Sequence, residues 1–217
     1  TRCYGYIGAE AYKTIKVRGN DDEKVYQAIG SKKEEGELKC KAKRIKLLYA
    51  GKIMESKGIY ELVNMFKSSF SEKKSSIQAS LTIIGYGKDS ELKRLRKSIK
   101  NEKWINYLGV IEMTETVYQL FDIGVVPSWI FSESLGLSAI ELAYYTGRVL
   151  INSGSNSFDD LYNIEGIKKI REGDNLERLV KELCDEKRVD KDRLKASLDV
   201  VNQIPVLLNA LAVKSEN

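Results

Sequence analysis

From about residue 45 onward, short apolar runs alternate with amphipathic stretches. The apolar runs at 45–50, 81–84, 104–108, 123–126 and 149–151 have the length and composition of strands. Helical spacing of apolar residues marks 60–70, 90–99, 116–121 and 135–145, with further helices at 175–183 and beyond residue 191. Strand, turn and helix repeated in this way predict right-handed βαβ units. We therefore expect an α/β fold, a Rossmann-like parallel sheet with helices on both faces.

The first 44 residues do not follow this pattern, and residues 31–46 are crowded with lysine, arginine and glutamate. A basic patch for nucleic acid or lipid headgroups is one interpretation of this segment. Glutamates lie between the cations and stacking aromatics are lacking, so a solvated linker or exposed hairpin is favoured. We expect no nucleic-acid partner.

Composition excludes several kinds of site. The 217 residues include 36 Lys+Arg, 31 Asp+Glu and no histidine, which rules out a Ser-His-Asp triad or a His-ligated zinc within this chain. The three cysteines are far apart and predict reduced thiols. No apolar run approaches the roughly 20 residues of a membrane helix. The chain begins at Thr1, and we expect it to be a piece of a longer protein.

Two glycine-containing turns follow predicted strands. The first, Gly51 to Gly58, carries Lys52 and Lys57 and opens a helix, which suits an anion of at least two charges. Its residue order is not that of a Walker A loop, and solvent-exposed lysines are the alternative reading. The second turn, around Gly85, lacks the third glycine of a dinucleotide fingerprint, so a tight βα turn is as good a reading as ligand contact.

A third segment, 127–141, holds two carboxylates, Glu133 and Glu141. With Ser134 as the helix N-cap, their backbones would lie about 12 Å apart at roughly 1.5 Å per residue. That separation is too long for a glycosidase-type carboxylate pair or a shared metal ion. It suits the two ends of one extended ligand, such as a sugar joined through a diphosphate to a nucleoside, with helix amides facing the phosphates.

Taken together, these elements resemble the C-terminal, nucleotide-sugar-binding domain of GT-B retaining glycosyltransferases of family 4. The resemblance covers about residues 45–160 and continues more weakly to the end of the chain. The segments that carry it are Gly51-Lys52 with Lys57-Gly58, Gly85-Tyr86-Gly87, Tyr107-Leu108-Gly109, Pro127-Ser128 and Glu133 to Glu141. Five elements in the family's order and spacing are far more specific than any one of them.

The resemblance implies a role for each matched residue. Lys52 and Lys57 would hold the diphosphate, Glu133 the donor sugar near its reacting carbon, and Glu141 the ribose. With Glu133, the two lysines form the implied catalytic set. The amides of Leu135, Gly136 and Leu137 would line the phosphates. The remaining donor-binding positions are Gly51, Gly85, Gly109 and, beside the base, the backbone of Val110 and Ile111.

Four departures from the family pattern bear on activity. Lys52 stands where the family usually has arginine, so the bidentate fork is lost. Leu135 replaces a phenylalanine, Val149 a proline, and Asn156-Ser157 a Gly-Gly pair.

The resemblance also implies a domain arrangement and partners. Residues 1–44 would be the tail of an N-terminal acceptor domain and a linker, 45–200 the donor domain, and 201–217 a C-terminal helix that packs back on the other domain. The donor would be a UDP-, GDP- or ADP-sugar, used without a metal or other cofactor. The acceptor would be a glycan or a lipid-linked glycan in cell-surface polysaccharide or glycolipid synthesis. The location would be cytoplasmic, including the inner face of the membrane.

Two other readings remain open. The chain could be a binding or assembly module that kept the GT-B fold without catalysis, which the departures allow. It could also be another Rossmann-type protein such as an NAD enzyme or an epimerase. The Glu133–Glu141 element argues against that last reading.

Overall fold

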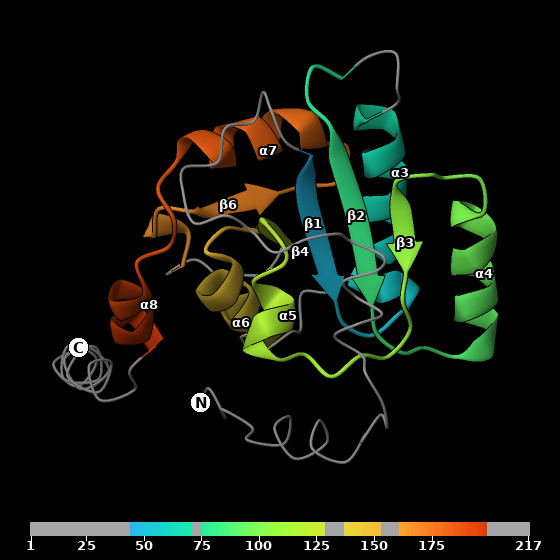
Figure 1. Cartoon of the computed structure of the whole chain (residues 1–217), viewed down its shortest axis with the longest axis horizontal. Coiled ribbons are helices and arrows are strands. Elements are labelled where there is room, and N and C mark those ends of the chain that lie inside the picture. Colours follow the sequence, from blue (N-terminus) through green and yellow to red (C-terminus); the bar gives the residue numbers. More distant parts are fainter. Residues whose placement is uncertain (1–43, 71–74, 129–136, 153–160, 199–217) are drawn as a thin grey trace, which may run out of the picture.

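The computed structural model describes residues 44–70, 75–128, 137–152 and 161–198 (Figure 1). The strands are β1 Ile45–Ala50, β2 Ala79–Ile84, β3 Ile105–Tyr107, β4 Ile123–Val126, β5 Val149–Asn152 and β6 Ile167–Ile170. The helices are α3 Ile59–Ser69, α4 Asp89–Ile99, α5 Glu115–Tyr118, α6 Leu137–Thr146, α7 Leu176–Asp185 and α8 Lys191–Leu198, with a short 3-10 turn η1 at Glu55–Lys57. All of the expected N-terminal tail and linker (1–44) except residue 44, and the expected C-terminal helix (201–217), lie outside these ranges.

The six strands form one sheet in the order β3-β2-β1-β4-β5-β6, and every pairing is parallel. The chain therefore builds outward from β1 to β3 and then returns to the other side of β1 with β4. This is the strand order of a Rossmann-type sheet, whose ligands bind where the winding reverses, here between β1 and β4. The predicted α/β fold is confirmed.

Side chains alternate along β1 between two apolar cores, one on each face of the sheet. Leu47 and Tyr49 pack with α3, α4 and α7, whereas Leu48 packs with α5, α6 and α8. A strand covered on both faces needs apolar residues at successive positions, which explains the continuous apolar runs in the sequence. The sheet is thus the middle layer of three, with helices on either side, as expected.

The predicted elements recur with small shifts at their ends, and one strand is new. Asn175 caps α7, since its side chain accepts a 3.0 Å hydrogen bond from the Arg178 amide. Strand β6 was not predicted, because Lys168 and Lys169 interrupt its apolar residues. It lies at the edge of the sheet, a position in which exposed lysines are common.

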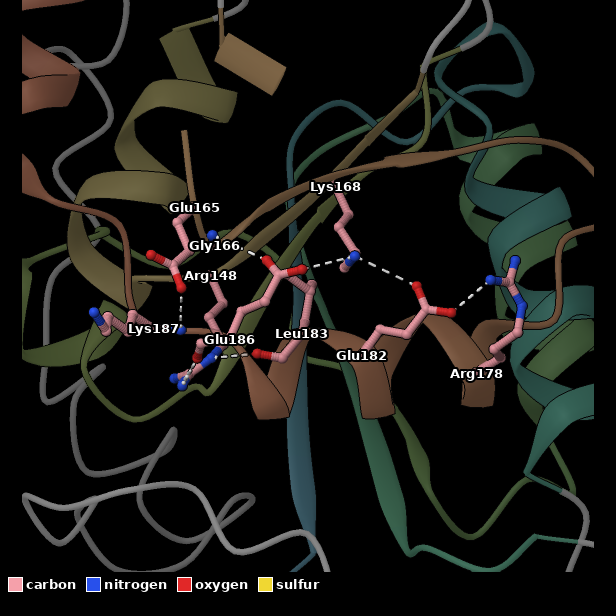
Figure 2. Close-up of polar contacts among 9 residues, drawn as sticks. All are labelled: Arg148, Glu165, Gly166, Lys168, Arg178, Glu182, Leu183, Glu186 and Lys187. Carbon is pink, nitrogen blue, oxygen red and sulfur yellow. Dashed lines mark hydrogen bonds and ion pairs between the residues drawn. The ribbon is translucent and has the colours of Figure 1, made fainter. Parts of the chain in front are cut away.

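The carboxyl end of α7 is fastened to the sheet by a polar network (Figure 2). The buried Arg148 guanidinium donates from Nε to the Leu183 carbonyl at 2.7 Å and from Nη2 to the Glu186 carbonyl at 2.8 Å. Lys168 of β6 contacts the Glu186 carboxylate at 2.7 Å and the Glu182 carboxylate at 3.4 Å. The two Arg148 hydrogen bonds satisfy carbonyls that the helix end leaves without intrahelical donors.

Candidate functional site

A pocket of about 280 Å³ opens at the carboxyl edge of the sheet, at the β1–β4 switch point. Its lining residues come from the ends of β1, β2 and β4 and from the start of α6: Tyr49, Ala50, Gly51, Lys52, Lys57, Tyr86, Val125, Val126, Ser128 and Ser138. The volume is near the lower end of the range of about 300–1,000 Å³ for small-molecule sites.

The turn after β1 is held by its neighbours on both sides. The Tyr49 hydroxyl, buried beneath the turn, donates a 2.7 Å hydrogen bond to the Lys52 carbonyl. The Gly51 amide donates to the Ile84 carbonyl at 3.0 Å, and the Ile53 amide donates to the Tyr86 carbonyl at 2.7 Å. The parallel ladder between β1 and β2 therefore continues past both strands, which fixes the backbone that carries Lys52.

Lys57 reaches the same pocket from the end of η1. The next residue, Gly58, has φ 71°, and its amide donates to the Glu55 carbonyl at 2.8 Å. This left-handed glycine ends η1 and lets α3 begin at once, with Ile59 as its first residue. Both lysines and the beginning of a helix thus lie at one end of the sheet, an arrangement that favours an anion.

The two lysines are close enough to affect each other. Burial lowers the pKa of Lys57, and the positive charge of Lys52 lowers it further. Lys52 is exposed, whereas Lys57 is half-buried. A bound anion would relieve this repulsion and offset the cost of burying the Lys57 ammonium.

The turns after β2 and β3 lie beside the pocket. The Gly85 amide donates to the Gly109 carbonyl at 2.7 Å, and the Tyr107 hydroxyl donates to the Gly85 carbonyl at 2.9 Å. Gly109 itself has φ 78°. Val110 is exposed and Ile111 is buried in the core beneath α5 and α6. None of Gly85, Gly109, Val110 or Ile111 lines the pocket itself.

Helix α6 carries the predicted residues Leu137 and Glu141, the second of which does not line the pocket. Leu137 is the first residue of α6, and Ser138 in the same turn lines the pocket. Glu141 lies one turn further along; the residue as a whole is exposed, but its carboxyl group is partly buried, and one carboxylate oxygen accepts a hydrogen bond from the Tyr118 hydroxyl. Burial of the carboxyl group raises the pKa of Glu141, and the hydrogen bond from Tyr118 partly offsets that rise.

The part of the pocket at the end of β4 is hydrogen-bonded to the end of β5. The Asn152 side-chain amide donates to the carbonyl of Ser128, and the Tyr162 hydroxyl donates to the Asn152 carbonyl at 2.5 Å. Asn152 and Ser128 are both buried. The backbone at the end of β4 is therefore fixed where the pocket begins.

Of the predicted site residues, Gly51, Lys52 and Lys57 line one pocket. Glu133, Leu135 and Gly136 lie outside the described residues, as do Asn156 and Ser157. Sequence reasoning did not single out Tyr49, Tyr86 or Ser138 as site residues. Tyr86 had a local signal in the sequence, because it is a large aromatic residue between two glycines after a predicted strand. In the structure it is 49% exposed. Ser138 had none beyond its place in the helix start.

Within the described ranges, no three His, Cys, Asp or Glu side chains gather in a group that could hold a metal ion. In the same ranges, no helix combines the length and the apolar character that crossing a bilayer requires.

Solved structures similar to this chain are glycosyltransferases and related enzymes. HepE from Anabaena, solved with UDP and glucose, superposes with a TM-score of 0.61 at 13% identity, over 88% of this chain and 52% of that one. Trehalose 6-phosphate synthase from Burkholderia multivorans gives 0.59 at 14% identity, over 94% and 47%. The C-terminal domain of LpcC, a group 1 glycosyltransferase from Francisella tularensis, gives 0.50 at 19% identity, over 74% and 85%.

At these identities the likeness shows the fold alone, a GT-B half. The chain spans about half the length of HepE and of the trehalose 6-phosphate synthase. No curated protein sequence matches it. The family model of glycosyl transferases group 1, however, matches residues 44–184, more than half of the chain and nearly all of its described part. The chain therefore belongs to the group 1 glycosyltransferases.

Proposed function

We propose that this chain is the donor-binding half of a retaining glycosyltransferase of family 4. It binds a nucleotide-diphosphate sugar, and the sugar passes with retention to a glycan or lipid-linked acceptor in cell-surface polysaccharide or glycolipid synthesis. The observation that carries the proposal is the pocket at the β1–β4 switch point, which Lys52 and Lys57 both line. The UDP and UDP-glucose bound in the HepE structures support this class of ligand.

In this proposal the lysines bind the diphosphate. When the bond between the sugar's anomeric carbon and the diphosphate breaks, its electron pair stays with the diphosphate, which becomes more negative. Two ammonium groups already in place stabilise that charge without reorganising, as oxyanion-hole donors do. Because Lys57 is half-buried, its attraction to the anion is screened less than that of a surface lysine.

The other residues take roles along the donor. Glu141 accepts from the ribose hydroxyls, and Glu133 from the sugar hydroxyls. Amides of Leu135, Gly136 and Leu137 contact the phosphates. The backbone of Val110 and Ile111, with Gly85 and Gly109 supporting it, borders the base. Ser138 is added to this set, since it lines the pocket at the start of α6.

The remaining proposals concern the rest of the protein. Residues 1–44 are the end of an N-terminal acceptor domain with its linker, 45–200 the donor domain, and 201–217 a helix that returns to the acceptor domain. Catalysis needs no metal, because the lysines supply the positive charge. The protein acts in the cytoplasm, including the inner membrane face where a lipid-linked acceptor would lie.

The test is calorimetric titration of the chain with UDP, GDP and ADP. At least one nucleotide should bind, and Lys57→Ala should weaken it by about 1–3 kcal/mol, the worth of a hydrogen bond to a charged group. The matched control is Lys93→Ala, which removes the same charge from the exposed side of α4. Equal affinity of wild type and Lys57→Ala would remove Lys57 from the site. No binding of any nucleotide would favour a non-catalytic assembly module.

A further inference from the structure

Tyr118 of α5 is a buried tyrosine whose ring is held on one side by other aromatics. Only 4% of Tyr118 is exposed, and its ring stacks on that of Tyr145 at 5.0 Å between centroids with 12° between planes. Tyr145 in turn meets Tyr144 edge to face at 5.0 Å. A ring packed in this way has little rotational freedom, so its hydroxyl occupies a defined place.

That hydroxyl donates a 3.1 Å hydrogen bond to Oε2 of Glu141. Glu141 is on the exposed side of α6, one turn after the pocket residue Ser138. A glutamate at such a position would ordinarily sample many rotamers. The bond to a fixed partner selects one of them and leaves Oε1, with its lone pairs, to accept other donors.

We propose that Tyr118 is a positioning residue, which holds the Glu141 carboxylate ready to accept hydrogen bonds from the hydroxyls of a bound donor's ribose. The inference rests on the proposed function, and deepens it by adding a residue that does not itself touch the donor. Without Tyr118 the carboxylate would have to be ordered when the donor binds, which weakens binding.

The effect of Tyr118 on Glu141 can be followed through the pKa of the Glu141 carboxyl group. Around the Tyr118–Glu141 pair, Tyr145 stacks on Tyr118 and meets Tyr144 edge to face, and Lys191 and Lys195 of α8 lie over the Tyr144 ring at 4.4 and 5.5 Å. The pKa of Glu141 is raised by burial and lowered by Tyr118. Removing the hydroxyl should therefore raise the pKa further and keep Glu141 protonated to higher pH.

The experiment compares wild type, Tyr118→Phe and a matched control, Tyr60→Phe, in the 217-residue chain. Tyr60 is also buried and also donates to a glutamate, Glu91, but between α3 and α4. Each variant is titrated with UDP, GDP and ADP and with inorganic pyrophosphate, across acid to neutral pH. The carboxyl titration of Glu141 is followed by carbon-13 NMR, with its signal assigned by its loss in Glu141→Ala.

Tyr118→Phe should weaken the affinity for the nucleotide that wild type binds by about three- to tenfold, within the range of one ordinary intramolecular hydrogen bond. Pyrophosphate, which has no ribose, should bind as before. In Tyr118→Phe, the pH below which nucleotide affinity falls and the pH at which Glu141 titrates should both be higher than in wild type. Tyr60→Phe should change neither. In a Glu141→Ala background, Tyr118→Phe should add nothing. Glu141→Asp changes an exposed residue, so the variant should fold, and it should lose a similar amount of nucleotide affinity.

The failures are distinguishable. Unchanged nucleotide affinity and an unchanged Glu141 titration in Tyr118→Phe overturn the positioning role and leave the proposed function standing. An equal loss for pyrophosphate also overturns it, since the change would then be a general one in the pocket. Wild type that binds none of the three nucleotides overturns the proposed function, and this inference with it.

Discussion

Gly85 lies so close to Gly51 that a Cβ atom on Gly85 would come within 1.7 Å of the Gly51 carbonyl oxygen. Gly85 also has φ 149°, a backbone conformation that side chains other than hydrogen rarely adopt. The turn after β2 therefore needs glycine at position 85, because the turn after β1 occupies the space where a side chain would go. This contact joins the two turns beneath the candidate donor pocket.

Gly85→Ala should destabilise the chain by about 2–4 kcal/mol, from backbone strain together with overpacking against a backbone atom that cannot rotate away. It should also weaken nucleotide binding, because the Gly51 backbone that leads into Lys52 must move. Chemical denaturation and nucleotide titration measure the two effects.

Gly173→Ala is the control for strain alone. Gly173 has φ 81°, but a Cβ there would meet nothing within 4 Å. It should cost about 1–2 kcal/mol and leave nucleotide affinity unchanged. Equal losses in the two variants would show that the close approach to Gly51 has no effect.

Nucleotide affinity should fall as pH rises through the pKa of Lys57. Burial and the charge of Lys52 lower that pKa below 10.5, so the ammonium loses its proton at lower pH than a free lysine does. Bound diphosphate favours the charged form, and binding should take up protons in this alkaline range. Calorimetry in buffers of different ionisation enthalpy measures the uptake.

The lowered pKa of Lys57 also affects the stability of the protein without nucleotide, and there a rise in pH is favourable. Between the folded and unfolded pKa values the unfolded chain binds more protons, so Lys57 costs stability at neutral pH and the cost disappears at alkaline pH. Lys57→Met should therefore raise the melting temperature of the free protein near pH 7 while it weakens nucleotide binding. A lower melting temperature in Lys57→Met would contradict this electrostatic account.

Nucleotide binding should be the same with EDTA as without it. The two lysines provide positive charge where a divalent cation would otherwise be needed. The measurement is titration in EDTA and in Mg²⁺ or Mn²⁺, with a metal-dependent nucleotide-binding protein as control. Collapse of the affinity in EDTA would overturn the metal-free proposal.

The 217-residue chain should bind a donor nucleotide but transfer no sugar. Juxtaposing acceptor and donor can contribute roughly 7–11 kcal/mol to catalysis, and in the proposed arrangement the acceptor groove belongs to the other domain. A donor-consumption assay on the preparation used for calorimetry tests this. Robust transfer by this chain would contradict the two-domain proposal.

Arg148→Leu should destabilise the chain by about 2–5 kcal/mol, since the Leu183 and Glu186 carbonyls lose their donor where α7 ends. Nucleotide affinity of the fraction that folds should not change. Arg178→Ala, which removes only an exposed ion pair with Glu182 at 2.6 Å, should cost about 0.3–0.5 kcal/mol. Denaturant titration compares the two variants, whose wild-type arginines are both drawn in Figure 2.

The fold was predictable wherever a strand is buried on both faces. The bounds of β1 and β4 agree with the apolar runs at 45–50 and 123–126, because most side chains there pack in one core or the other. Strand β6 was missed because Lys168 and Lys169 interrupt its apolar residues, and at a sheet edge backbone pairing to β5 suffices to hold such a strand. Apolar periodicity carries no signal for such a strand.

The candidate site was predictable where its charged residues lie in a single loop of the sequence. Lys52 and Lys57 flank the same loop, so their meeting at one pocket followed from the order of strand and helix. Tyr118 and Glu141 lie 23 residues apart, and their hydrogen bond depends on how α5 packs against α6. No spacing rule in the sequence encodes that packing.

The pocket lies where the two cores of the protein meet, which has a consequence for how the protein responds to a ligand. Tyr49 and Val125 belong to the core beneath α3 and α7, whereas Ala50 and Val126 pack on the side of α6. A ligand that contacts these four residues should stabilise the apolar cores on both faces of the sheet. Amide hydrogen exchange should therefore slow on bound nucleotide in helices on both faces of the sheet, including α7, which contributes no residue to the pocket lining.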